Sequence, residues 1–430
     1  MNEKIFSVAI LGTGARGADV YGRIMAKFPE KFNIVSLCDI REERLSVFGE
    51  EFGVEEKNRF TDEEEFFKEK RADVIIIATQ DADHVRHAIK ALELGYDILL
   101  EKPITDSKSE CKRLLNAQKK SGKNVIVCHV LRYAPAFVKA FELIDKGEIG
   151  ELVSIDALER VGYWHQAHSF VRGNWRSTKY TAPMILAKCC HDLDLLQYYA
   201  KSRCNSISSV GNLAHFAKEN APEGADVRCT SCKHIETCPY SAKKIYIDMW
   251  HADGSPEDTW PYNIITQAPL DENKLYRAIE NGPYGRCVYR CDNNVCDHMS
   301  IIMEFDNAVT ATFSLHAQSS DIHRDIHILC ENGEIYGDDH KGKIQVTHFI
   351  RNQAQTPVTE YYETTEYDTG HGGGDDGIME DFTAGLSLSG TDSRSSISRS
   401  VESHLMACAI EQARITGTVI DMKAFKESLL

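Results

Sequence analysis

Residues 6–17 read FSVAILGTGARG, an apolar run of strand type followed directly by a complete Gly-x-Gly-x-x-Gly loop. Gly12 permits a tight turn after the strand, Gly14 lets a pyrophosphate approach the backbone, and Gly17 allows the next helix to pack closely on the strand. That helix, Ala18–Lys27, presents free N–H groups and the positive end of its dipole to the same point. The loop therefore predicts a dinucleotide site, with a glycine turn that binds no ligand as the alternative.

The residues around this loop alternate strand-type runs with helical patterns as far as residue 127. Such alternation predicts a parallel sheet that is covered by helices on both faces. We therefore expect an α/β domain of the Rossmann type over residues 1–127, followed by an α+β domain over residues 128–430. The strand-type runs of the first domain are Phe6–Leu11, Asn33–Cys38, Asp73–Ala78, Asp97–Leu100 and Asn124–Val127.

Asp39 lies at the end of the second predicted strand, 22 residues after Gly17. An acidic residue at this place accepts hydrogen bonds from the ribose hydroxyls of adenosine, and its charge repels a 2′-phosphate. The sequence therefore predicts NAD as the cofactor in preference to NADP. Arg41, two residues further on, weakens that preference, because an arginine near this strand end can accommodate the 2′-phosphate.

From Gly150 onward the pattern changes to longer strand-type runs with few helices. This succession predicts an α+β domain with a large open, mostly antiparallel sheet. One clear helix, Pro183–Ala200, interrupts the strands, and residues 217–285 are an insertion without clear periodicity. The strand-type runs are Leu152–Ala157, Ser206–Leu213, Ser300–Phe305, Val309–His316, Arg324–Leu329 and Ile344–Phe349.

The charge of the chain argues against two classes of partner. The 430 residues carry a formal net charge of −16, whereas nucleic acids and anionic membranes bind basic surfaces. We therefore expect neither as a partner. The sequence has no apolar run as long as a membrane span, and Met1–Ser7 has a single basic residue and no signal-peptide pattern. These features predict a cytoplasmic protein in a reducing compartment.

Glu101, Lys102 and Pro103 directly follow the strand-type run Asp97–Leu100. Ligands bind beyond the carboxyl ends of the strands in open α/β sheets, so we expect this tripeptide in the cleft. Pro103 favours an extended conformation of Lys102, which can aim the ammonium group across the cleft. Oxidation of an alcohol requires a base for the hydroxyl proton and a cation or donor near the developing alkoxide, and Lys102 is a candidate for this chemistry.

The same tripeptide ends a longer pattern, Thr79…His84…Ala88…Ala91-Leu92…Gly95…Glu101-Lys102-Pro103. Combined with the glycine loop and Asp39, it resembles the Gfo/Idh/MocA oxidoreductase family, which includes glucose–fructose oxidoreductase and inositol dehydrogenases. The resemblance continues in Arg132-Tyr133-Ala134-Pro135, which is similar to the stretch that leads into the family's second domain. Motif and resemblance together imply NAD contacts at Gly12, Gly14, Ala15, Arg16, Gly17, Asp39, Arg41, Thr79, His84, Glu101 and Lys102.

His191-Asp192-Leu193-Asp194 is similar to the His-x-x-Asp motif that opens a helix in the family's second domain. By this resemblance Lys102 is the catalytic lysine, His191 is the acid/base on the substrate hydroxyl, and Asp194 binds substrate or orients His191. A histidine suits this task because its unperturbed pKa lies near neutral pH. A capping or core histidine is the alternative. His371, in a glycine loop, either closes over the substrate or is solvated, and the second interpretation is slightly favoured.

Two positions depart from the family's pattern. Polyol dehydrogenases of the family often carry an aspartate four residues before this histidine, but Ala187 stands there, so the pattern is not that of a plain inositol dehydrogenase. Lys188 either lowers the pKa of His191 and acts on the substrate, or lies solvated at the surface.

For Trp175 and Arg176, ordinary packing is an equal alternative to substrate binding. The expected substrate contacts are Arg132, Tyr133, Trp175, Arg176, Lys188 and Asp194.

The resemblance implies that the protein oxidises a ring hydroxyl of a sugar or glycoside to a ketone with NAD. One alternative is an enzyme that breaks a glycosidic bond through a transient ketone and regenerates its NAD. Another, from a different class, is a dinucleotide-binding sensor without activity, although the presence of both Lys102 and His191 speaks against it. Members of the family commonly pair the sheet of the second domain with another subunit, so a homodimer or homotetramer is also implied.

Cys229, Cys232 and Cys238 form a Cys-x2-Cys-x5-Cys pattern inside the insertion. Three thiolates at this spacing suit a tetrahedral zinc, which would be structural and would pin a segment that lacks an obvious core. Cys287 is favoured as the fourth ligand because its segment, Gly285–Tyr289, resembles part of the family's sugar-directed subgroup. Reduced thiols and an iron–sulfur cluster are the alternatives. The other candidates for a fourth ligand are Cys291, Cys296, His215, His234 and His251.

Overall fold

The computed structural model describes residues 4–105, 107–338, 343–349, 356–364, 370–387 and 393–428. The first domain is built on a parallel sheet with the strand order β3-β2-β1-β4-β5-β6. This is the order of a doubly wound dinucleotide-binding domain, so the predicted Rossmann fold is confirmed. The strands are β1 (Phe6–Leu11), β2 (Phe32–Cys38), β3 (Arg59–Phe60), β4 (Val74–Ile77), β5 (Asp97–Leu100) and β6 (Val125–Val127).

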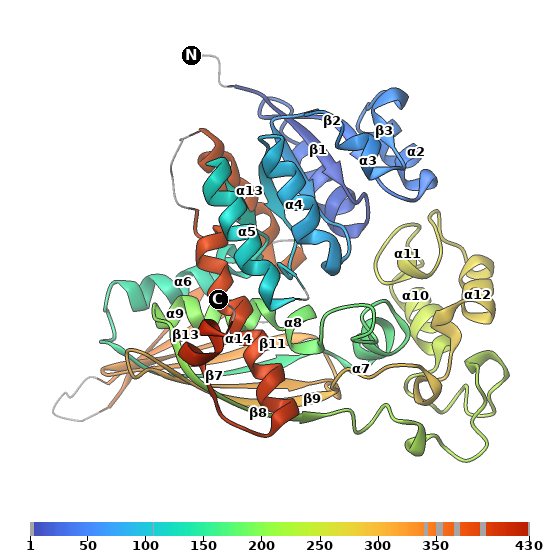
Figure 1. Cartoon of the computed structure of the whole chain (residues 1–430). Coiled ribbons are helices and arrows are strands. Elements are labelled where there is room, and N and C mark those ends of the chain that lie inside the picture. The colour runs from blue at the N-terminus through green and yellow to red at the C-terminus, as the bar shows by residue number, and fades with distance from the viewer. Residues whose placement is uncertain are drawn as a thin grey trace.

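Helices cover this parallel sheet (Figure 1). The helical turns after the glycine loop, Ala15–Gly22, are wider than those of an α-helix and continue into α1 (Arg23–Ala26). A segment from the far end of the chain also packs here, because α13 (Gly374–Ser387) buries Ile378 and Phe382 in the same apolar cluster as β1. The other helices of this domain are α2 (Glu42–Glu51), α3 (Glu63–Phe66), α4 (His84–Glu93) and α5 (Lys108–Ser121).

Within the described residues, the second domain has a nine-stranded sheet with the order β14-β13-β12-β11-β7-β10-β9-β8-β15. Its neighbouring strands are antiparallel except for β7 and β10, so the predicted mostly antiparallel sheet is confirmed. Buried and exposed residues alternate along β9, which leaves one face of the sheet uncovered. The predicted homo-oligomer stays a prediction. The strands are β7 (Leu152–Arg160), β8 (Cys204–Asn212), β9 (His298–Phe305), β10 (Thr310–His316), β11 (His323–Cys330), β12 (Gly333–Asp338), β13 (Lys343–His348), β14 (Val358–Glu363) and β15 (Ile420–Asp421), followed by α15 (Met422–Glu427).

Three helices lie between this sheet and the first domain: α6 (Pro135–Asp145), α9 (Cys190–Ala200) and α14 (Ile397–Thr416) (Figure 1). The sequence predicted neither α6 nor the division of the helix over 183–200, which is interrupted between α8 (Met184–Ala187) and α9. None of the described helices is both long enough and apolar enough to cross a membrane.

The insertion forms a compact unit at one end of the large sheet (Figure 1). It has an apolar cluster of its own, which includes Tyr240, Tyr246, Trp250 and Leu275, so the expectation that it lacks a core is wrong. Seven of its 19 buried residues are aromatic, and they are scattered in the sequence without helix or strand periodicity. The helices of this region are α7 (Tyr163–His165), α10 (Met249–Ala252), α11 (Tyr262–Ile265) and α12 (Glu272–Asn281).

Candidate active site

The glycine loop has the shape that a pyrophosphate site requires. Gly12 has a φ of +92°, and a Cβ there would lie 2.4 Å from the carbonyl oxygen of Ala78, so the tight turn requires glycine. A Cβ on Gly17 would lie 2.0 Å from the carbonyl oxygen of Gly12, so the approach of helix to strand requires glycine as well. At Gly14 a Cβ would meet only the Arg44 side chain, at 3.1 Å, which leaves the backbone accessible. The loop therefore fits the diphosphate of NAD.

Asp39 lies beside this loop, at the end of β2. Its Oδ2 accepts hydrogen bonds from the backbone N–H (2.8 Å) and the hydroxyl (3.0 Å) of Thr13. Its Oδ1 accepts one from the N–H of Arg41 (2.9 Å), whose side chain is exposed, and the guanidinium of Arg44 lies 3.8 Å from the carboxylate. The carboxylate is thus fixed next to the glycine loop, where an adenosine ribose would meet it.

The substitution Asp39→Ala should weaken NAD binding. We expect Kd to rise about 10–100-fold, because a hydrogen bond to a charged group contributes about 1.5–3 kcal/mol. The preference for NAD over NADP should also shrink, since the repulsion of the 2′-phosphate is removed. Titration calorimetry with both dinucleotides measures these changes, and Glu43→Ala, at an exposed carboxylate nearby, is the control. An unchanged Kd for the Asp39 variant would place the ribose elsewhere.

Glu101 is buried and positions Lys102. Its Oε1 accepts hydrogen bonds from Nε of Arg16 (2.7 Å) and from the hydroxyl of Tyr21 (2.9 Å), and its Oε2 accepts one from the N–H of Lys102 (2.9 Å). Burial alone would raise the pKa of Glu101, but the charges of Arg16 and Lys102 outweigh it and lower the pKa. Arg16 and Glu101, both predicted as cofactor contacts, thus bind each other.

Thr79 and His84 connect the loops that follow β4 and β5. One ring nitrogen of His84 is hydrogen-bonded to the carbonyl oxygen of Pro103 at 2.7 Å, and the other to that of Thr79 at 3.2 Å. The Thr79 hydroxyl lies 3.0 Å from Nδ1 of His87. These bonds fix the relative positions of two loops at the carboxyl ends of the strands. Direct contacts of either residue with NAD stay predictions.

Lys102 and His191 come from different domains, and the Lys102 side chain reaches the segment that precedes His191. Nζ of Lys102 donates a hydrogen bond to the carbonyl oxygen of Ala187, at 3.3 Å, at the end of α8. His191 follows four residues later in the first turn of α9, is 4% exposed, and has no hydrogen-bond partner among the described residues at either ring nitrogen. Burial, and next the charge of Lys102, lowers the pKa of His191 well below its ordinary value. The imidazole is therefore neutral at pH 7 and able to accept a proton.

Lys188 is paired within the protein. Its Nζ lies 3.0 Å from the buried carboxylate of Glu159, and Arg324 in turn contacts Glu159 (2.8 Å) and Asp192 (2.8 Å). Burial raises the pKa of Asp192 to about 7, against the opposing charge of Arg324. Lys188 is not among the charges that affect the pKa of His191 most. The expected effect of Lys188 on that pKa therefore stays a prediction, and the alternative, a solvated surface lysine, does not fit its pairing with Glu159.

Arg132 and Asp194, both predicted as substrate contacts, bind each other. Nε and Nη2 of Arg132 donate to the two carboxylate oxygens of Asp194 at 2.5 and 2.7 Å, and the Ser403 hydroxyl donates to one of them at 3.0 Å. Arg132 is 2% exposed and Asp194 is 1% exposed. Because a buried guanidinium needs a carboxylate partner, the carboxylate of Asp194 serves to compensate the charge of Arg132. Asp194 makes no hydrogen bond to His191 in the described part of the chain, and its expected role in binding substrate or orienting His191 stays a prediction.

The other predicted substrate contacts also face neighbouring protein. The hydroxyl of Tyr133 donates a hydrogen bond to Asp381 of α13, at 2.9 Å. Nε of Arg176 donates to Asp292 at 2.8 Å. Trp175 is half-buried against the main apolar cluster. For Trp175 and Arg176 the structure thus corresponds to ordinary packing, which was the alternative interpretation.

His371 and Asp375, from the far end of the chain, complete the surroundings of His191. The rings of His371 and His191 are 5.5 Å apart between centroids, and Nδ1 of His371 lies 3.0 Å from a carboxylate oxygen of Asp375. Asp375 is fully buried and also pairs with Arg16 at 2.6 Å. The glycine loop and the surroundings of His191 are therefore connected through one carboxylate. The sequence marked His371 as a candidate but gave no signal for Asp375.

His165 and Gln166 were missed by sequence reasoning. Nδ1 of His165 and both side-chain polar atoms of Gln166 are buried without a hydrogen-bond partner among the described residues. Burial, and next the charge of Lys188, lowers the pKa of His165 well below its ordinary value, so this ring lies on the Lys188 side of the site. Trp260 of the insertion lies 5.1 Å from the ring of His165 and 5.2 Å from that of Trp164. No motif or spacing marks these residues in the sequence.

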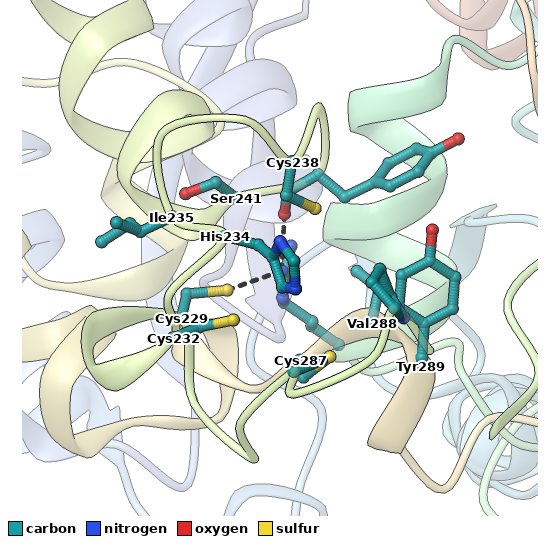
Figure 2. Close-up of a pocket in the computed structure, with 13 residues that line it drawn as sticks. Cys229, Cys232, His234, Ile235, Cys238, Ser241, Cys287, Val288 and Tyr289 are labelled. Atoms are coloured by element: carbon teal, nitrogen blue, oxygen red, sulfur yellow. Dashed lines mark hydrogen bonds between the residues drawn. The ribbon is translucent and has the colours of Figure 1, made fainter. Parts of the chain in front are cut away.

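The four cysteines predicted as zinc ligands are brought together by the fold. Cys229, Cys232, Cys238 and Cys287 line a single pocket of the insertion (Figure 2). Across the described ranges, however, no group of three or more His, Cys, Asp or Glu side chains is arranged to hold a metal ion. The structure thus shows that the four thiols share a pocket but does not show the predicted zinc.

Two family models match this chain. One, described as the oxidoreductase family with an NAD-binding Rossmann fold, matches residues 6–129. The other, described as the C-terminal alpha/beta domain of the oxidoreductase family, matches residues 141–227. The chain belongs to the Gfo/Idh/MocA family and is an NAD-binding oxidoreductase.

The relatives of this chain include dehydrogenases of cyclic polyols and sugars. YteT of Bacillus subtilis (strain 168), which carries the name of an oxidoreductase, is 23% identical over 88% of this chain and 89% of its own. The scyllo-inositol 2-dehydrogenase (NAD(+)) of the same organism is 27% identical, but the match covers 48% of this chain and only 57% of that relative. Levoglucosan dehydrogenase in complex with NADH and levoglucosan has the same fold, with a TM-score of 0.71, 17% identity, and coverage of 97% of this chain and 100% of that chain.

Proposed function

We propose that the protein oxidises a ring hydroxyl of a sugar or glycoside to a ketone, with NAD as the oxidant. The observation that carries this proposal is that Lys102 of the first domain bonds to Ala187, four residues before the buried and unpartnered His191, and that its charge helps to lower the pKa of that histidine. When bound, NAD supplies the nicotinamide ring that takes up two electrons from the substrate carbon. His191 accepts the hydroxyl proton, and the ammonium group of Lys102 stabilises the negative charge that develops on the oxygen.

Unpartnered polar groups and aromatic rings around His165 favour a carbohydrate as the substrate. Gln166 and Nδ1 of His165 are buried without partners in the described chain, and a buried polar group of this kind costs free energy until a ligand bonds to it. Trp164 and Trp260 place aromatic rings beside His165, which suits the apolar face of a sugar ring. The named substrates of two relatives, scyllo-inositol and levoglucosan, support the same class.

A panel of sugars, inositols and glycosides incubated with the protein and NAD tests the proposal. We expect NADH to form with at least one member, together with an equal amount of the matching keto product. Glycoside cleavage without net NADH would instead support the enzyme that uses a transient ketone and regenerates its cofactor. NAD binding without turnover of any member, unaffected by Lys102→Ala, would identify a dinucleotide-binding sensor.

A further inference from the structure

The cysteine pocket of the insertion combines two segments that are far apart in the sequence. The N–H of Cys287 donates a hydrogen bond to the carbonyl oxygen of Val227 at 2.9 Å, which brings Cys287 next to the segment of Cys229, Cys232 and Cys238. The four cysteine side chains are seen around the pocket in Figure 2. The pocket has room for at least one ion or water molecule among its lining residues.

A buried cation lies against these thiols without a carboxylate partner. Arg172 is 1% exposed, and its Nη2 donates hydrogen bonds to Sγ of Cys229 (3.4 Å) and to the carbonyl oxygen of Tyr240 (2.7 Å). Its Nε donates to the carbonyl oxygen of Arg286 (2.7 Å), while Nη1 has no hydrogen-bond partner in the described chain. None of these acceptors is a carboxylate, yet a buried charge is normally paired with an opposite one. Among the described residues, Arg172 therefore has no carboxylate partner.

We propose that Cys229, Cys232, Cys238 and Cys287 bind one zinc ion as thiolates, and that Arg172 compensates part of the resulting charge. Binding of Zn²⁺ displaces four thiol protons to solvent and leaves a tetrathiolate centre with two negative charges. The guanidinium of Arg172 supplies one positive charge and an N–H···S hydrogen bond, as partners of metal-bound ligands commonly do. Four thiolates complete a tetrahedral site, so the metal is structural and has no open position for chemistry.

Zinc binding requires the four thiols of the pocket to converge further than they do in this structure. In their present rotamers the described thiols do not form a finished ligand set. Zn–S bonds of about 2.3 Å set the distance to which the four sulfurs must approach the ion.

The position of Arg172 connects this centre to the proposed substrate side. Arg172 ends the helical segment Gln166–Arg172, and Gln166 and the preceding His165 carry the unpartnered polar groups described above. Trp260, from the same insertion, contacts the ring of His165. Loss of the metal should therefore disturb substrate binding and leave NAD binding intact. The expected effect on substrate binding rests on the proposed function, whereas the expected metal content does not.

Elemental analysis of the purified full-length protein, after incubation with ZnCl₂ under reducing conditions and removal of excess metal, tests the centre directly. We expect about one zinc per chain, lost in Cys232→Ser and Cys287→Ser. The matched control is Cys291→Ser, because Cys291 is also in this region but does not line the pocket, and it should keep the metal. NAD binding by each variant verifies that the first domain is folded.

Replacement of zinc by Co²⁺ provides a measurement that does not depend on a variant. A tetrathiolate centre gives thiolate-to-cobalt charge-transfer absorption together with the strong visible bands of tetrahedral Co²⁺, and we expect both. Wild-type protein that takes up neither metal, or that contains iron and sulfide instead, would overturn the proposal. Retention of zinc by Cys287→Ser together with its loss from Cys291→Ser would also overturn it.

Discussion

Replacing His191 with asparagine should lower kcat by about 10²–10⁴-fold, the usual contribution of a positioned general base. NAD affinity should stay the same, because the glycine loop and Asp39 belong to the other domain. Stopped-flow measurement of NADH formation with a substrate from the panel gives kcat, and calorimetry gives the Kd of NAD. The control is His298→Asn, a histidine on β9 that is exposed, which should leave kcat unchanged.

The pH profile of the unaltered enzyme gives a second readout of the same residue. Burial, and next the charge of Lys102, holds the pKa of His191 well below the ordinary value of 6.5. Because the neutral imidazole is the active base, kcat/KM should stay level as the pH falls through 6.5 and should decline only near the lowered pKa. A decline centred at the ordinary histidine pKa, or a kcat of His191→Asn within a few-fold of wild type, would contradict the role of His191.

Replacing Asp194 with asparagine should lower the free energy of unfolding by about 3–5 kcal/mol, because it leaves the buried charge of Arg132 without its partner. Urea unfolding, followed by fluorescence, measures the loss. The double substitution Arg132→Met and Asp194→Leu removes both charges and should recover a large part of the lost stability. An Asp194→Asn variant as stable as wild type would show that the Arg132–Asp194 pair does not contribute this stability.

The same pair makes stability depend on pH in a defined direction. Burial alone would raise the pKa of Asp194, but the charge of Arg132 outweighs it, so the pKa in the folded protein is lowered. The pair therefore contributes its full stability above the unfolded-state pKa of about 3.9, and loses it as the pH falls through the lower, folded-state pKa. Asp194→Asn should remove this part of the acid dependence.

The first domain could be predicted because its local signals agree with one another. The glycine loop, the four buried residues of β4 and the acid at the end of β2 each specify the same parallel sheet. In the second domain β14 was missed because its residues are nearly all exposed, so they show no alternation. The glycines Gly333 and Gly337 likewise obscure the pattern of β12. The packing of α13 on the first domain joins parts of the chain that no local pattern connects.

Site residues could be predicted where a sequence motif fixes the backbone. The pairing of one side chain with another could not be predicted. Lys102 was identified because it follows the end of a predicted strand, and His191 was identified through its resemblance to the family's His-x-x-Asp motif. The pairing of Arg132 with Asp194, 62 residues apart, depends on where two helices meet, and the motif alone could not show it. The same is true of Arg16 and Asp375, which are 359 residues apart.

A crystal structure of the protein with NADH and a sugar substrate from the panel tests most directly whether Lys102 and His191 act on the same substrate oxygen. We expect one substrate oxygen within about 2.6–3.2 Å of both the Lys102 ammonium nitrogen and a ring nitrogen of His191, with the adjoining carbon facing the nicotinamide ring. A substrate bound with these two nitrogens on different oxygens, or with its reacting carbon turned away from the ring, would contradict this expectation.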